Sequence, residues 1–142
     1  MILVDANLLI YAVNRQATMH RAAKAWLEGA IGGDEPVGLS WNVIVAFLRL
    51  TTRRGLFEEP LTVRAAFELI ERWLAQPNVE IVHPGARHLD LMKKMLLSLG
   101  TAGNLTSDAH LAALAIENDA ELYSADADFD RFHGLKWTNP LE

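Results

Sequence analysis

The sequence predicts an α/β fold, a three-layer sandwich in which helices cover both faces of a central, mostly parallel sheet. Short apolar runs of three or four residues alternate with longer segments whose apolar residues recur at helical spacing. The breaks between these segments are brief and rich in Gly and Pro. Strands that alternate with crossover helices imply parallel pairing. The 142 residues suit one domain, residues 1–142, that buries about two thirds of the unfolded chain's surface.

The first half of the chain predicts two strands and three helices. Ile2 to Val4 forms a strand that leads into a helix near Asn7. The next helix is predicted over 21–31, and its inner face is expected to carry Ala22, Ala25, Trp26 and Leu27. A short strand over 37–39 precedes a helix over about 41–53, which Ser40 can cap.

The second half continues the alternation. Thr62 is a candidate N-cap for a helix that runs to about residue 75. Small residues dominate the helix predicted over 107–118 and allow close backbone packing. The other predicted elements are strands over 79–82 and 121–123, helices over 86–99 and 127–132, and a weak strand at 136–137.

Composition excludes several classes of protein. With 13 Lys and Arg against 18 Asp and Glu, the net charge is −5, which argues against a DNA-binding protein with a broad cationic surface. The chain has no Cys, so disulfides, thiolate nucleophiles and Cys-type zinc sites are absent. The longest apolar runs are six residues, against roughly 18 for a membrane helix. We therefore expect a cytoplasmic protein with no membrane partner.

Four aspartates follow the ends of predicted strands or open a predicted helix. Asp5 ends the first strand, Asp108 opens the helix over 107–118, and Asp126 and Asp128 follow the strand over 121–123. Ligands of parallel sheets gather at the carboxyl ends of the strands, so these acids are expected to converge at one edge. Converging carboxylates repel one another, and a divalent cation relieves that repulsion. An all-oxygen ligand set favours Mg²⁺ or Mn²⁺ over zinc.

Each acid also has a purely structural interpretation. An Asp at the start of a helix is a favoured capping or first-turn residue, which applies to Asp5 and Asp108. Asp126, Asp128 and Asp130 can equally form a solvated acidic turn. The hypothesis of a metal site therefore depends on the joint placement of the acids.

Three segments resemble the PIN-domain ribonucleases, specifically the VapC-type toxins of type II toxin–antitoxin systems. They are MILVDANLLIYA at 1–12, TSDAHLAALA at 106–115 and YSADADF at 123–129. Further segments resemble one VapC subgroup: FLRLTT at 47–52, WLAQPNV at 73–79, RHL at 87–89 and LKWTNPL at 135–141. The likeness covers nearly the whole chain and implies a PIN-like fold, Mg²⁺-dependent endoribonuclease activity on structured RNA such as tRNA, homodimers, and a VapB-type antitoxin.

The resemblance also implies residue roles. Asp5, Asp108 and Asp126 match the family's metal-site acids, and Asp128 matches a frequent additional acid, which makes all four candidate catalytic residues. Asn7 matches a polar residue often found beside the metal, where it would contact substrate.

One position departs from the family pattern. PIN domains commonly carry a Glu on the helix after the second strand, and Ala46 stands in that place here. Either Asp128 supplies the missing charge, or metal binding is weaker than in relatives with four acids.

Basic and aromatic residues give further candidates. Arg49 shares a helix face with positions 46 and 53 that would look toward the acids, so Arg49 is a candidate RNA or antitoxin contact, although a solvated helix end is the alternative. The five His residues show no i, i+4 pair and are expected in surface or capping roles. By helical spacing Trp26 and Trp73 belong to the core.

Three functions are compatible with these features. The first is a metal-dependent endoribonuclease toxin. The second is a catalytically weakened PIN domain that binds protein, which Ala46 supports. The third, a phosphatase of the haloacid dehalogenase type, requires Asp-x-Asp after the first strand, and position 7 is Asn.

Overall fold

A five-stranded parallel sheet in the order β3-β2-β1-β4-β5 forms the centre of the computed structural model, which describes residues 1–142. The strands are β1 (Ile2–Val4), β2 (Val37–Ser40), β3 (Val79–Val82), β4 (Glu121–Tyr123) and β5 (Trp137–Thr138). Leu3 in the middle strand is aligned with Gly38 on one side and Leu122 on the other. Because β1 is buried along its whole length, its three residues are all apolar.

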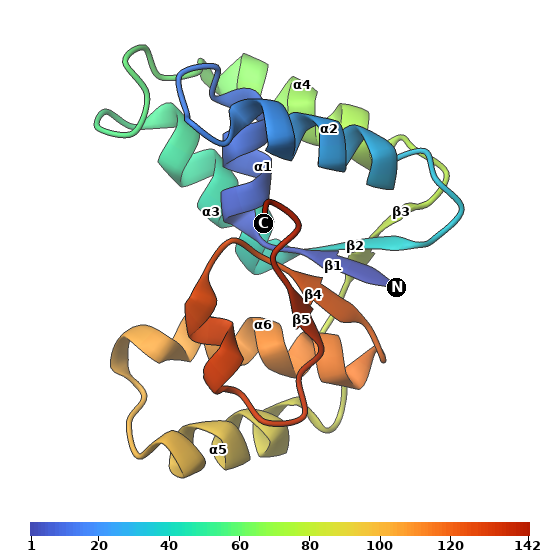
Figure 1. Ribbon diagram of the computed structural model, residues 1–142, viewed down its shortest axis with the longest axis vertical. Helices are drawn as coiled ribbons and strands as arrows, with labels where there is room; N and C mark the ends of the chain where they lie inside the picture. The colour runs from blue at the N-terminus through green and yellow to red at the C-terminus, as the bar shows by residue number, and fades with distance from the viewer.

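Six helices cover the two faces of this sheet. They are α1 (Ala6–Val13), α2 (His20–Ala30), α3 (Trp41–Thr52), α4 (Val63–Leu74), α5 (His88–Leu99) and α6 (Thr106–Glu117). Figure 1 shows α1 to α4 on one side of the sheet and α5 and α6 on the other. Two short 3₁₀ turns, η1 (Gly103–Leu105) and η2 (Ala127–Arg131), precede α6 and follow β4. The three-layer α/β arrangement predicted from sequence is confirmed.

The predicted helix caps are present. The Ser40 hydroxyl accepts a hydrogen bond from Val43 N at 3.2 Å, and Thr62 Oγ1 accepts one from Ala65 N at 3.1 Å. At the other end of a helix, Gly100 closes α5 with a φ of 74°, in the left-handed region that suits glycine. These local signals place the helix ends close to where the sequence predicts them.

The core fills the space between the sheet and both helix layers. Phe47 of α3 and Trp73 of α4 pack edge to face, with ring centroids 5.2 Å apart, and both are buried as predicted for Trp73. Trp26 is half-buried and stacks on Tyr123. On the opposite face, α6 buries four alanines together with Leu111 and Leu114.

The boundaries differ from the predicted ones by one or two residues. The final strand pairs at 137–138 where the sequence predicts 136–137, because Leu122 N bonds to the Lys136 carbonyl and residue 136 lies at the strand's edge. The segment after Asp126 is a 3₁₀ turn, and α6 begins at Thr106. No helix is long and apolar enough to cross a membrane.

Candidate metal centre

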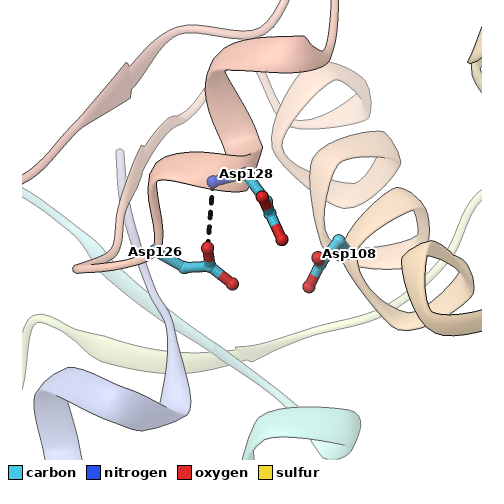
Figure 2. A group of neighbouring side chains, drawn as sticks. All are labelled: Asp108, Asp126 and Asp128. Atoms are coloured by element: carbon cyan, nitrogen blue, oxygen red, sulfur yellow. Dashed lines mark hydrogen bonds between the residues drawn. The ribbon is translucent and has the colours of Figure 1, made fainter.

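Three aspartates from two segments lie together beyond the carboxyl ends of the central strands. Asp108 belongs to the first turn of α6, Asp126 follows β4, and Asp128 lies on η2. One carboxylate oxygen of each lies within 4.8 Å of the others, and Figure 2 shows the three side chains converging on one space. None of the three has an ion pair within the protein. The arrangement therefore gathers negative charge without a cation of its own.

The pKa of Asp108 reflects how close these carboxylates lie to one another. Partial burial, followed by repulsion from Asp126, Asp5 and Asp128, raises the pKa of Asp108 to about 6. A divalent cation bound between these oxygens would remove the repulsion, and carboxylate oxygens are the ligands that Mg²⁺ and Mn²⁺ prefer. The residues present fit such an ion.

Asp126 combines two roles that the sequence left as alternatives. Its Oδ1 accepts a hydrogen bond from Asp128 N at 2.9 Å and so caps η2. Figure 2 shows the other oxygen pointing toward Asp108. The capping bond fixes the side chain, which leaves one oxygen directed at the space between the acids.

Asp5 lies beside this group but outside it. Its Oδ1 accepts from Ala6 N at 2.7 Å, and its Oδ2 accepts from Ser124 Oγ at 2.6 Å and from Asn7 Nδ2 at 3.3 Å. Burial is the main cause that raises the pKa of Asp5, and repulsion from Asp126 adds to it. Asp5 is thus close enough to influence the centre electrostatically, and its role as a direct ligand stays a prediction.

Ser124 is a residue that our sequence reasoning missed. It is fully buried, and its hydroxyl donates to Asp5 while it accepts from Asp126 N at 3.0 Å and from Asn7 Nδ2 at 3.2 Å. The available signal was its position, since a small polar residue directly after β4 lies at the same sheet edge as the acids.

Asn7, in the first turn of α1, joins this helix to the segment after β4. Its Nδ2 donates to Asp5 and Ser124, and its Oδ1 accepts from Ala125 N at 3.2 Å. The side chain therefore has a clear structural role at the centre. Its predicted contact with substrate stays a prediction.

Comparison with known proteins identifies the family. The PIN domain matches residues 2–135 of this chain. Ribonuclease VapC37 of Mycobacterium tuberculosis is 46% identical over 138 residues, covering 97% of this chain and 96% of that protein. Ribonuclease VapC33 of the same organism is 45% identical over 141 residues, covering 99% of each chain. This chain belongs to the VapC ribonucleases of the PIN-domain family.

Solved VapC structures share the fold. VapBC2 from Rickettsia felis, bound to a promoter DNA fragment, matches with a TM-score of 0.72, covering 98% of each chain at 19% identity. VapC20 of Mycobacterium tuberculosis, described as a toxin that cleaves the sarcin-ricin loop, matches with a TM-score of 0.65, covering 96% of this chain and 99% of the other at 22% identity. At these identities the likeness shows the fold alone.

The helix α3 contributes no acid to this VapC centre. No Asp or Glu occurs between Trp41 and Thr52, and Ala46 is half-buried at the position where the resemblance leads us to expect Glu. Asp128 from η2 is the third member of the acidic group instead. Arg49 is exposed and forms no ion pair, so its side chain is available for a ligand, and its predicted role stays a prediction.

Our expectation for the histidines is wrong for two of them. His88 and His110 are joined by a hydrogen bond of 2.8 Å, and His88 also bonds to Glu117. Sequence spacing could not reveal this pair, because the two residues lie on different helices and meet only when α5 packs against α6. His20, by contrast, bonds locally to the Tyr11 carbonyl.

Proposed function

We propose that this chain is a Mg²⁺-dependent endoribonuclease toxin of the cytoplasm, with Mn²⁺ as an alternative ion. The observation that carries the proposal is the group of three unpaired carboxylates, Asp108, Asp126 and Asp128, at ligand spacing. The family and the curated relatives named ribonucleases support the reaction class. The reaction would hydrolyse a phosphodiester bond of RNA.

The residues divide the work by position. Asp108 and Asp126 would hold the ion together with Asp5, which lies beside them. The exposed Asp128 would ligate it through water or accept a proton from the attacking water. When bound, Mg²⁺ lowers the pKa of a coordinated water and offsets charge on the phosphoryl oxygens. The hydrogen bonds of Asp5, Asn7 and Ser124 fix the segment that carries Asp126 and Asp128 against the junction of β1 and α1.

Structured RNA such as tRNA is the proposed substrate class. The description of VapC20 as cleaving the sarcin-ricin loop supports a structured RNA target for a protein of this fold. The net charge of −5 argues against recognition through a broad cationic surface. Recognition therefore depends on the metal centre and on local basic residues such as Arg49.

A VapB-type antitoxin is the proposed regulator, and a homodimer is the proposed assembly. Solved VapBC complexes from Rickettsia felis and Haemophilus influenzae share the fold of this chain. The chain carries a groove of about 330 Å³ between α2 and α4, with Leu27, Ile31, Leu69 and Trp73 in its walls. Trp41 and Val45 on α3 and Phe67 on α4 are exposed apolar side chains that a partner or a second copy would cover.

A protein-binding module with weakened catalysis is the second candidate function. Ala46 favours it, because a centre without an acid on α3 has one carboxylate fewer than the family pattern provides. The two functions differ in one measurable respect. Both allow Mg²⁺ binding, but only the nuclease breaks RNA.

The test compares Asp108→Asn with Asp34→Asn, an exposed control that removes the same charge. We expect both variants to melt cooperatively. Only Asp108→Asn should lose Mg²⁺ binding, measured by titration calorimetry, and Mg²⁺-dependent cleavage of tRNA. Mg²⁺ binding by the wild type without cleavage favours the binding module, and unchanged cleavage by pure Asp108→Asn refutes the proposed centre.

Expression tests the toxin role. The chain alone should arrest growth, and co-expression of the small protein encoded beside it should relieve the arrest. Arrest that persists with Asp108→Asn contradicts a nuclease mechanism.

A further inference from the structure

A hydrogen-bonded chain lies on the side of α6 that faces α5. Gly85 N donates to Glu117 Oε2 at 3.0 Å, Glu117 Oε1 lies 2.6 Å from His88 Nδ1, and His88 Nε2 lies 2.8 Å from His110 Nδ1. The side chains of His88 and Glu117 are only 12% and 7% exposed. None of the four residues belongs to the acidic group. We call them the Glu117–His88–His110 chain.

The donors and acceptors of this chain are largely determined by chemistry. The Glu117 carboxylate is an acceptor only, so the proton in its contact with His88 comes from Nδ1. The contact between His88 Nε2 and His110 Nδ1 then requires one proton between the two nitrogens. The two rings meet edge to face, with centroids 4.7 Å apart. The imidazole of His88 thus bonds at both ends and bridges two residues of α6.

Helix geometry places this chain behind Asp108. At 3.6 residues per turn, His110 lies about 200° around the axis from Asp108. Glu117 lies seven residues beyond His110 on the same face, about 10.5 Å along the axis. His88 therefore bonds to two residues of α6, His110 and Glu117, on the side of the helix opposite the metal centre.

Small side chains make up most of the buried surface of α6, so apolar packing restricts its rotation and sliding less than a row of long side chains would. Four of its six buried residues are alanines, so only Leu111 and Leu114 offer long buried side chains that can interlock with neighbours. No side chain caps its N-terminus. The covering helix α5 contributes one buried residue, Met95. Because hydrogen bonds are directional, the polar chain restricts the rotation and sliding of α6 more than the small apolar side chains do.

Electrostatic repulsion also acts on the first turn of α6 and favours its movement away from the other acids. Asp126, Asp5 and Asp128 all repel the Asp108 carboxylate. A helix free to rotate would relieve this repulsion by moving Asp108 away, and the ligand spacing would be lost.

We propose that the Glu117–His88–His110 chain fixes the rotation and axial position of α6 and thereby holds Asp108 at ligand distance from Asp126 and Asp128. His88 and His110 are positioning residues in this proposal, because they act through the helix and not on substrate. The inference rests on the proposed function only in that the acids bind Mg²⁺.

Three variants test it. His110→Ala removes the contact with His88, whereas His110→Asn keeps a side-chain N–H donor near the place of Nδ1. Met95→Ala is the matched control, since it loosens the same helix interface without cutting the chain. We expect the Kd for Mg²⁺ to rise about tenfold in His110→Ala, as for other supporting residues of metal ligands, and to stay near the wild-type value in the other two. Met95→Ala should lower Tm without changing the Kd for Mg²⁺.

A second measurement needs neither metal nor RNA. In metal-free protein, the backbone ¹⁵N resonances of Ser107 and Asp108 should shift in His110→Ala, return in His110→Asn, and stay in place in Met95→Ala. Should His110→Ala fail to fold, His88→Gln replaces it, because one amide cannot reach both partners.

The inference is overturned if His110→Ala and Met95→Ala change Mg²⁺ affinity and the resonances equally, or if His110→Ala changes neither. Wild-type protein that binds Mg²⁺ and leaves RNA intact would contradict the proposed function and leave this inference standing. Wild-type protein that binds no Mg²⁺ contradicts the metal centre, and the resonances then decide the positioning role.

Discussion

Single side chains at this centre both form hydrogen bonds that stabilise the fold and contribute charge to the acidic group. Asp126 caps η2 with one oxygen and faces Asp108 with the other. Asp5 is held by Ser124 and Asn7, and the Ser124 hydroxyl also accepts from Asp126 N. Because a buried acceptor without a partner is costly, removal of one hydroxyl affects several carboxylate-bearing segments.

Ser124→Ala is therefore expected to lower the free energy of unfolding by about 1–3 kcal/mol. The variant leaves Asp5 Oδ2 with its longer bond to Asn7 only and leaves Asp126 N without its acceptor. Urea unfolding measures the effect. Ser98→Ala, at an exposed position of α5, is the control and should change stability little. Equal effects of the two substitutions would contradict the network.

Asp108 predicts a dependence of stability on pH. The pKa of Asp108 in the folded protein, about 6, lies above the ordinary Asp value of 3.8, so the folded protein holds this proton more tightly than the unfolded chain. The contribution of Asp108 to stability is therefore present below about pH 4 and is lost as pH rises through about 6.

We accordingly expect Tm of the wild type to fall relative to Asp108→Asn between pH 4 and pH 7 in chelator. Calorimetric scans of both proteins measure this difference. Parallel Tm profiles across that range would show that burial and the neighbouring acids do not raise the pKa of Asp108.

At the scale of elements, the close packing of neighbouring strands limits which side chains fit at a position of the sheet. A Cβ added to Gly38 of β2 would lie 2.4 Å from Val82 Cγ2 and 3.3 Å from Leu3 Cδ1. By contrast, Gly29 in α2 has nothing within 4 Å of an added Cβ. The two glycines thus sit in regular elements for different reasons.

This contrast predicts opposite effects on stability. Gly38→Ala should destabilise the protein by about 1–3 kcal/mol, because Val82 is too stiff to yield. Gly29→Ala should stabilise it by about 0.5–1 kcal/mol, because alanine loses less conformational entropy in a helix. Urea unfolding of both variants measures the pair, and a neutral Gly38→Ala would show that β2 and β3 can separate locally.

At the scale of the whole molecule, the proposed metal centre would couple folding to ion binding. Asp108 comes from the layer of α5 and α6, and Asp126 and Asp128 follow β4 in the central sheet (Figure 1). An ion that joins them links two layers and binds the folded state alone, which raises stability.

Mg²⁺ at a hundred times its Kd should therefore stabilise the wild type by about 2.7 kcal/mol. Urea unfolding with Mg²⁺ and with chelator measures the gain. Asp34→Asn should show the same gain and Asp108→Asn little of it. A gain of equal size in Asp108→Asn would place the bound ion elsewhere.

Much of this arrangement could be predicted from the residues. Periodicity and the caps Ser40 and Thr62 give the helices, and the short apolar runs give the strands. The rule for parallel sheets brings Asp108 and Asp126 to one edge, as the structure has them. The Glu117–His88–His110 chain and the role of Ser124 escaped prediction, because their partners are 22 to 119 positions apart in sequence.

The sequence by itself determined the order of elements, the α/β class and the edge at which the acids gather, because these follow from local periodicity and from the handedness of crossover connections. The resemblance of the segments at 1–12, 106–115 and 123–129 indicated the family. Only the tertiary structure decided that Asp128 joins Asp108 and Asp126 at ligand spacing while Asp5 is held by Ser124. It also decided that His88 bonds to both Glu117 and His110. Side-chain contacts of this kind depend on rotation and distance between packed elements, which no local pattern encodes.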